Sequence, residues 1–476
     1  MRKTYFSRLR VGRLLALIAI LLAVAPLSSA NAQVAAAYDF GLICENETSP
    51  GVYNGTIDIT ATDGYISIPD GNTVYMWGFG FGVPGTAAYQ HPGPTLCFSE
   101  NQAVTITLHN TLPENVSVIF PGQSDVLAGG QPVAAQVADN SLSQFAAPNG
   151  SMSYSFTASH AGTFIYESGT SLQKQVQMGL FGTIVVRPTL GNNYIYDWAE
   201  TQFNPINDYT LLLSEIDPDW HAAVEDAVNA YNAGGAYDAT PYSVVDYHPR
   251  YWQINGRSFP DTIAPNHAAW LPTQPYGSLL HIHPMVNPAR PGQDTGHGYQ
   301  EFPSAVRVLN VGMLNHPIHP HGNHVQIVGR DGNPLLGPSN EDLSYFKFNV
   351  MTGAGQVWDT LYRWTDVDGF SPANPVPYDV DTVQGDNSDT ILSPRNLNIL
   401  FKDPNFFSGS PYLGYQANKN DGNAATYNQC GEYYQIWHSH ALNEAANYEA
   451  GFGGMITLER IDPPAGSTPL AAQCSP

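Results

Sequence analysis

Residues 103–112 read AVTITLHNTL, a stretch in which Val104, Ile106 and Leu108 alternate with other, mostly polar residues. Side chains two residues apart in an extended chain point to the same face, so this alternation predicts a β-strand. Five further stretches also read as strands: 151–158, 182–188, 304–312, 324–332 and 454–461. Short strands separated by turn residues are typical of β-sandwiches. We therefore expect an all-β fold.

One stretch departs from the β pattern. Residues 217–235, DPDWHAAVEDAVNAYNAGG, predict a helix with Asp217 or Asp219 as its cap and the paired glycines at its end. We interpret this helix as an insertion rather than a layer of the core. A turn-rich segment after Pro188 marks a domain boundary. We expect the division to follow four ranges: a signal peptide at 1–32, an N-terminal domain at 33–190, a C-terminal domain at 200–462 and a tail at 463–476.

The N-terminus has the features of a secretory signal peptide. A basic segment precedes the apolar run 14–24, and an A-x-A cleavage site ends at Ala32. The apolar run is shorter than the ~20 residues that a spanning helix needs, which favours a removable signal over a retained anchor. The anchor remains the alternative. We expect a secreted or periplasmic protein with no transmembrane segment in the mature chain.

The charge of the chain limits its partners. The formal net charge is −23, from 41 acidic and 18 basic residues. Nucleic acids and anionic membrane surfaces attract proteins with patches of lysine and arginine. We therefore expect neither as a partner.

The four cysteines of the chain are Cys44, Cys97, Cys430 and Cys474. An even number of cysteines in an exported chain favours disulfides, and four cysteines allow three connectivities. No pair has the C-x-x-C spacing, and none lies beside a histidine cluster. We interpret the four as structural disulfides rather than metal ligands, and the connectivity stays open.

Two histidine-rich motifs stand far apart in the second half of the chain: HPIHPHG at 316–322 and WHSH at 437–440. Each holds two histidines two residues apart, and such a pair shares one face of a strand. If the two strands lie close, four imidazoles converge, a ligand set that suits copper or zinc. These four are His319, His321, His438 and His440. Histidines that are merely hydrogen-bonded at strand ends are the alternative.

Other histidines point away from this group. His316 is an odd number of positions from His319, so we expect it to face a second site. His281 and His283 form another same-face pair in a connection rich in proline and glycine, with His297 downstream. We interpret this pair as exposed, and an unrelated copper or zinc site is the alternative.

The motifs resemble those of multicopper oxidases. HPIHPHG is similar to the family's H-P-x-H-x-H-G signature, and the stretch 437–455 is similar to its W-H-C-H-x-x-x-H…G-M segment. Further matching stretches extend the resemblance over nearly the whole mature chain: 92–122, 162–182, 254–262 and 306–312. The resemblance implies tandem cupredoxin-like Greek-key β-sandwiches with loop and short helical insertions. The close spacing of INGRSFPDT and HPIHPHG favours two such domains over three. Two-domain relatives often build their copper cluster between subunits of a trimer, so the resemblance also suggests a homotrimer.

Few copper ligands of the family are retained. By the resemblance, His316 matches a blue-copper ligand, His319 a type 2 ligand, and three residues match type 3 ligands: His321, His438 and His440. The cysteine that binds blue copper and passes on electrons is Ser439 here, and the second blue-copper histidine falls at Glu444. A serine hydroxyl stays protonated near neutral pH and cannot replace a thiolate. The electron relay of the family is therefore broken.

The first-domain ligand positions are also changed. Ile119 and Pro121 stand in the family's H-x-H-G, and Glu167 and Gly169 stand in its H-S-H. All four first-domain cluster ligands thus lack an imidazole, although Glu167 could supply an oxygen ligand. Met455 matches the axial position of the blue-copper site. We do not expect an oxygen-reducing trinuclear centre.

The sequence leaves three functions open. We expect an exported multicopper-oxidase-like protein whose residual second-domain histidine site binds copper or zinc, with at most limited oxidoreductase activity. The alternative is a metal-free structural or binding module derived from an oxidase. A third option is an active oxidase with a rearranged copper set that uses HIHP. Whether the chain is an enzyme, and which residues would be catalytic, stays undecided by the sequence.

Overall fold

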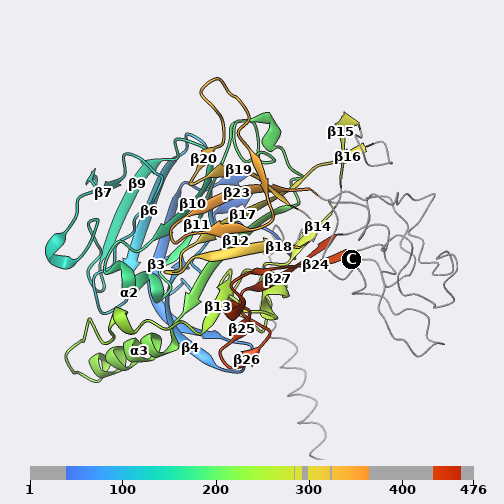
Figure 1. Cartoon of the computed structure of the whole chain (residues 1–476). Coiled ribbons are helices and arrows are strands. Elements are labelled where there is room, and N and C mark those ends of the chain that lie inside the picture. The colour runs from blue at the N-terminus through green and yellow to red at the C-terminus, as the bar shows by residue number, and fades with distance from the viewer. Residues whose placement is uncertain (1–38, 284, 292–298, 322–323, 364–432, 462–476) are drawn as a thin grey trace, which may run out of the picture. The chain divides into compact units, whose positions relative to one another are not determined.

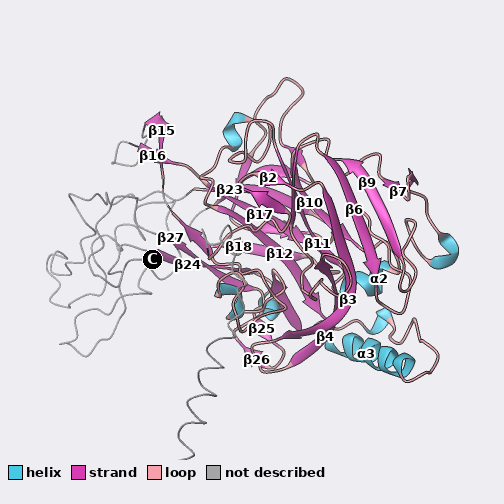
Figure 2. Ribbon diagram, turned by 180° about the vertical axis from the view of Figure 1, so that it is seen from behind, coloured by secondary structure: helices cyan, strands magenta, loops and turns pink. Residues whose placement is uncertain are grey.

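The fold is built almost entirely from short strands, as the sequence predicts. The computed structural model describes residues 39–283, 285–291, 299–321, 324–363 and 433–461. Within these ranges the strands form several sheets, and two segments are α-helical (Figures 1 and 2). Short 3-10 helices occupy 137–139, 199–201, 244–246, 261–263 and 442–444.

The strands of the first half pair with one another in two main sheets. A six-stranded sheet has the order β4-β3-β6-β9-β7-β8, with β3 (Thr56–Ser67), β4 (Thr73–Phe81), β6 (Ala103–Asn110), β7 (Leu127–Ala128), β8 (Gln131–Pro132) and β9 (Ser151–Thr157). A three-stranded sheet has the order β10-β11-β5, with β5 (Leu96–Ser99), β10 (Gly162–Glu167) and β11 (Phe181–Arg187). β1 (Glu47–Ser49) pairs with β2 (Val52–Tyr53). A shared core of side chains such as Trp77, Ile106 and Phe164 joins the two main sheets.

The strands of the second half also form two main sheets. The nine-stranded sheet has the order β20-β19-β23-β17-β12-β13-β25-β26, with β21 paired to β19. Its strands are β12 (Asp208–Ile216), β13 (Tyr251–Ile254), β17 (Ser304–Asn310), β19 (Val325–Arg330), β20 (Asn333–Pro334), β21 (Tyr345–Lys347), β23 (Val357–Tyr362), β25 (Ala446–Asn447) and β26 (Ala450–Gly451). The second sheet has five strands in the order β14-β27-β24-β18-β22. These are β14 (Leu280–Ile282), β18 (His316–Pro320), β22 (Val350–Thr352), β24 (Tyr433–Ser439) and β27 (Ile456–Ile461), while β15 (Val286–Pro291) and β16 (Tyr299–Glu301) form a separate hairpin.

The predicted helix is present, but its role differs from the prediction. α3 (Pro218–Asn232) follows Asp217, whose carboxylate accepts a hydrogen bond from the Asp219 amide at 3.1 Å. Its buried face is part of the core of the first half, through Trp220, Val224 and Val228. The helix packs on β4 (Figure 1). It is therefore a core element that the second half supplies to the first, not an insertion outside the core.

A buried network of ion pairs and hydrogen bonds also joins the two halves. Arg307 on β17 donates to the carboxylate of Asp208 at 2.9 Å, and Arg187 at the end of β11 donates to the same carboxylate at 2.5 Å. The hydroxyl of Thr163 on β10 donates to Asp359 on β23 at 2.5 Å. Buried charges are tolerated when they are paired and hydrogen-bonded, so these contacts favour one arrangement of the strands.

Some predictions concern residues near the ends of the chain. Cys44 and Cys97 form a disulfide, as expected for one pair, while Cys430 and Cys474 lie outside the described residues. The signal stretch 1–32 and the tail 463–476 also lie outside them. Among the helices that the structure describes, none has the length and apolar character needed to cross a bilayer.

The short helix α2 (Leu172–Gln177) was not predicted. With six residues it completes fewer than two turns, too few for a periodic pattern to show in the sequence. Its Lys174 side chain is buried and forms an ion pair with Glu114. The helix therefore depends on tertiary contacts rather than on a local sequence signal.

Candidate metal centre

The two histidine motifs meet because β18 and β24 are neighbouring antiparallel strands. His319 stands opposite His438 in their register. The amide of His321 donates to the carbonyl of Ile436 at 2.9 Å, and the amide of His440 donates to the carbonyl of Pro317 at 2.7 Å. Residues opposite one another and two positions away share a face of a sheet. The pairing thus brings the four histidines of the two motifs to one face.

The imidazoles lie close enough to share an ion. Ring centroids are 4.9 Å apart for His319 and His321, 5.1 Å for His321 and His438, and 5.1 Å for His319 and His440. One nitrogen from each of His319, His321 and His438 lies within 4.8 Å of the other two. The Nε2 atoms of His321 and His438 are 3.1 Å apart. Two metal–nitrogen bonds of ~2.0–2.1 Å at a near-tetrahedral angle separate their nitrogens by roughly 3 Å.

Backbone carbonyls fix the orientation of two of these rings. Nδ1 of His319 lies 2.5 Å from the carbonyl oxygen of Phe348, and Nδ1 of His438 lies 2.7 Å from that of Ser439. A carbonyl oxygen can only accept, so Nδ1 carries the proton in both rings. In the neutral imidazole the lone pair is then on Nε2. This arrangement, with one nitrogen donating to a carbonyl and the other able to bind the metal, is common for metal-binding histidines.

The local environment favours neutral rings. Burial lowers the pKa of His319 and His438; their hydrogen bonds to carbonyls act in the opposite direction, and the neighbouring imidazoles lower the two pKa values further. A metal binds the neutral imidazole, so a lowered pKa keeps the ligand form at neutral pH. His440 differs from the others because its side chain is exposed and it is not part of the group of three.

His316 lies on the opposite face of β18 and is fully buried. Its Nε2 is 2.9 Å from a carboxylate oxygen of Glu215, and its Nδ1 is 2.9 Å from one of Glu444. The hydroxyl of Ser439 donates to the same oxygen of Glu444. Burial lowers the pKa of His316, but the two glutamates outweigh it and raise the pKa to about 9. Both ring nitrogens are engaged, so the predicted ligand role of His316 is not supported by this geometry.

Glu215 is the residue of this cluster that sequence reasoning missed. It lies on β12, and its carboxylate accepts hydrogen bonds from the amide of Met313 at 2.6 Å and the hydroxyl of Tyr247 at 2.7 Å. The backbone of residue 312 passes so close to this carboxylate that a Cβ there would lie 1.8 Å from one of its oxygens. Only glycine fits at this position. The available signal was an acidic residue within the apolar run LLLSEI of residues 211–216.

Comparisons with known proteins find similarity to multicopper oxidases in the first half of the chain and in the fold. The family model described as "Multicopper oxidase" matches residues 85–190. The first half of the chain is thus similar to a multicopper oxidase domain. A blue copper oxidase from Nitrosomonas europaea aligns in structure with a TM-score of 0.50 and 16% sequence identity, over 85% of each chain. This identity supports a shared fold alone, and the all-β architecture matches cupredoxin-fold multicopper oxidases.

Two further structures are similar at lower scores. The multicopper oxidase mgLAC has a TM-score of 0.49 and 15% identity over 86% of each chain. A copper nitrite reductase from Nitrosomonas europaea has a TM-score of 0.42 and 15% identity, over 87% of this chain and 96% of that one. No curated protein matches the sequence.

In this multicopper-oxidase-like chain the first-half ligand positions are filled by other side chains. Ile119 forms an isolated β-bridge with Glu167. A Cβ at Gly169 would lie 2.6 Å from the side chain of Ile119, so these two positions are in close contact. Burial raises the pKa of Glu167 to about 7. Across the described ranges, the three histidines are the only group placed to share an ion, and Glu167 does not join them.

The remaining histidine pair is half-buried rather than exposed, which corrects the prediction. The rings of His281 and His283 have centroids 4.2 Å apart. The amide of His283 donates to the side chain of Asn207 at 3.0 Å, which fixes the end of β14. His297 lies outside the described residues. In the part of the chain that the structure describes, this pair gains no third ligand.

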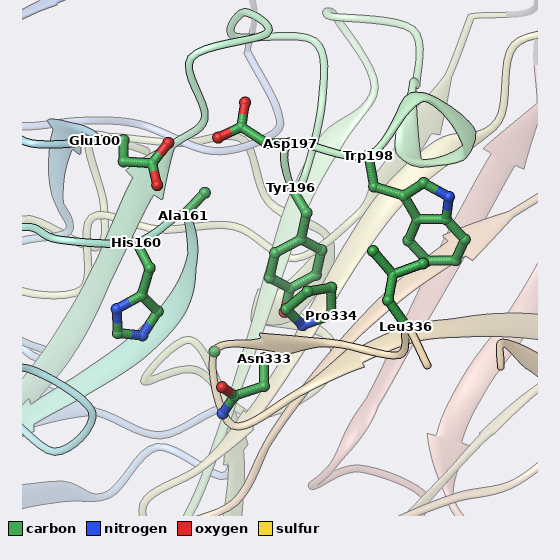
Figure 3. A pocket seen from close by; sticks show the side chains of 10 residues that line it. Glu100, His160, Ala161, Tyr196, Asp197, Trp198, Asn333, Pro334 and Leu336 are labelled. Atoms are coloured by element: carbon green, nitrogen blue, oxygen red, sulfur yellow. The ribbon is translucent and has the colours of Figure 1, made fainter. Parts of the chain in front are cut away.

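A separate cavity of about 270 Å³ lies away from both motifs. The carboxyl groups of Glu100 and Asp197 lie on the same side of it (Figure 3). Burial and the Asp197 carboxyl raise the pKa of Glu100 to about 7. Asp197 accepts hydrogen bonds from the hydroxyl of Thr189 and the amide of Leu190, both at 2.8 Å. The cavity is smaller than the ~300–1,000 Å³ of most ligand pockets.

Proposed function

We propose that this chain binds a single copper ion through His319, His321 and His438, without the blue-copper chemistry of a laccase. The observation that carries the proposal is the convergence of three imidazole nitrogens within 4.8 Å on neighbouring strands. The family resemblance favours copper as the metal. A nitrogen site also binds Cu²⁺ more tightly than Zn²⁺ in the general order of divalent metals.

The protein contributes orientation and a defined protonation state. The carbonyls of Phe348 and Ser439 hold the rings of His319 and His438 through Nδ1, which leaves the lone pair on Nε2. Copper bound there would supply a metal centre that can change oxidation state. Ser439 cannot replace the thiolate that carries electrons in the family. We therefore propose copper storage or delivery, with limited redox activity toward small oxidants or reductants, and not oxidation of organic substrates coupled to oxygen reduction.

The proposal is tested by the metal content of the purified protein. The chain is prepared without a histidine tag, offered copper and zinc together, dialysed, and analysed by mass spectrometry. We expect about one copper per chain in the wild type and none in the double variant His319→Ala/His438→Ala. The control is His248→Ala, which changes an exposed histidine outside the motifs. A wild type that retains no copper would leave the metal-free binding module as the better explanation.

Export and assembly are separate parts of the proposal. We propose that residues 1–32 are a signal peptide, that the mature chain has domains at 33–190 and 200–462, and that it forms a homotrimer. The signal peptide predicts Gln33 as the first residue of the exported protein, which N-terminal sequencing checks. Light scattering of the mature chain distinguishes a trimer from a monomer.

A further inference from the structure

We infer that the position of the blue copper in multicopper oxidases is occupied here by a metal-free ion lock, formed by Glu215, His316, Ser439 and Glu444. The lock fills the space of a redox centre with paired charges. It does not depend on whether copper binds the histidines on the other face of the strands.

The structure brings together the positions that the family resemblance assigns to the blue centre. The imidazole of His316 and the hydroxyl of Ser439 both contact the carboxylate of Glu444. The axial position, Met455, is buried beside them: its carbonyl accepts from the amide of Ser439 at 3.0 Å, and its amide donates to the carbonyl of Glu444 at 2.9 Å. The geometric frame of a blue-copper site therefore persists, while two of its four ligands are replaced.

The arrangement of charges does not suit a metal ion. Glu215 and Glu444 contact the two different nitrogens of His316, so they lie on opposite edges of the ring and cannot bind one ion together with it. Two ring nitrogens that both donate to carboxylates define an imidazolium, which has no lone pair to offer. The described part of the chain contains no group of metal-binding side chains that includes these residues.

The lock connects the segments that carry the histidine centre. Glu215 comes from β12, His316 from β18, Ser439 from β24, and Glu444 from the 3-10 turn Leu442–Glu444. His316 precedes His319 by three residues on β18, and Ser439 stands between His438 and His440. A metal in this place would cross-link β18 to β24 and the turn after it. The ion lock makes the same cross-link with hydrogen bonds and charge.

The role of Glu215 shows that the lock is a built arrangement. Its carboxylate accepts from the amides of Met313 and Leu314 at 2.6 and 3.1 Å and from the hydroxyl of Tyr247. These donors stabilise a buried negative charge, and the imidazolium lies between it and Glu444. A buried charge of this kind is strongly destabilising once a partner is removed. The lock should therefore contribute to stability and not to metal content.

The test compares copper content, visible absorption and thermal midpoint in three proteins. The wild type should show no intense copper–thiolate band. His316→Gln should keep the copper content of the wild type, whatever that content is, with a thermal midpoint several degrees lower. The double variant Ser439→Cys/Glu444→His restores a His–Cys–His–Met set. We expect it to take up one further copper per chain and to become intensely blue.

Two results would overturn the inference. Loss of one copper from the protein on His316→Gln would show that His316 is a metal ligand. A double variant with native-like circular dichroism but no further copper would show that these positions do not frame a blue-copper site. If the double variant does not fold, Glu444→Gln replaces it, since it removes a charge with little change of shape. A lower midpoint with unchanged copper then supports the lock, and an unchanged midpoint contradicts it.

Discussion

The two faces of β18 hold the same side chain in opposite electrostatic environments. His319 is half-buried among other imidazoles, and its pKa is lowered. His316, three residues earlier, is buried between two glutamates, which raise its pKa to about 9. Burial acts in the same direction on both rings, so the carboxylates make the difference. Whether a histidine in this motif is a metal ligand or a cation is decided by what faces it, not by the motif.

The largest effect should come from removing the cation of the lock. His316→Gln leaves Glu215 and Glu444 buried without their shared partner, and loss of one partner of a buried ion pair costs about 3–5 kcal/mol. We expect a fall of that size in the free energy of unfolding, measured by urea denaturation. The matched control His248→Gln should stay within about 0.5 kcal/mol of the wild type. If the two variants are equally stable, His316 does not stabilise the protein through its glutamates, and the contrast between the two faces of β18 is wrong.

The next largest effect should be a dependence of stability on pH that comes from His316. Because the pKa of His316 in the folded protein is about 9, above its value of ~6.5 in the unfolded chain, the folded state holds the proton more tightly. Its contribution, roughly 3 kcal/mol, is complete below pH ~6.5 and is lost as the pH rises to about 9. We expect the difference in unfolding free energy between the wild type and His316→Gln to decline across that pH range. Urea denaturation at each pH measures this difference. A difference that does not change with pH would contradict the imidazolium.

On the other face, the histidines should not contribute equally to copper binding. His438→Ala removes a member of the group of three, and we expect copper affinity to fall more than ~100-fold, beyond the ~10–100-fold of outer-sphere partners. His440→Ala changes an exposed ring outside that group and should lower affinity less than ~10-fold. Competitive titration with a chelator measures both. Equal losses of copper affinity in the two variants would show that His440 is a fourth ligand.

The smallest effect should come from the serine of the lock. Ser439→Ala removes one hydrogen bond to Glu444 and leaves the ion pairs of His316 in place. Because hydrogen bonds to charged groups contribute about 1.5–3 kcal/mol, we expect a loss of about that size in the free energy of unfolding. Copper content should be unchanged, because the alanine keeps the backbone carbonyl that orients His438. A loss of copper in this variant would mean that the two faces are coupled.

The sequence predicted those features that local patterns encode. Alternation located β6 and β9, and the two-residue spacing of the histidines indicated a shared face before any pairing was known. Glu215 was not predicted, because its partner His316 lies 101 residues away and no local pattern links them. The same limit explains α3: its cap Asp217 and its paired glycines are visible in the sequence, but the surface on which it packs is not.

The place of α3 in the first sandwich affects how the protein can be made. Trp220, Val224 and Val228 belong to a core whose strands end at Arg187. A chain emerging from a ribosome or an export channel presents those strands before the helix that completes their core. The strands of the first half are therefore synthesised before the helix that completes their core. This core can finish folding only after residue 232 has emerged. Until then, apolar surface on the nascent chain must be shielded by other means.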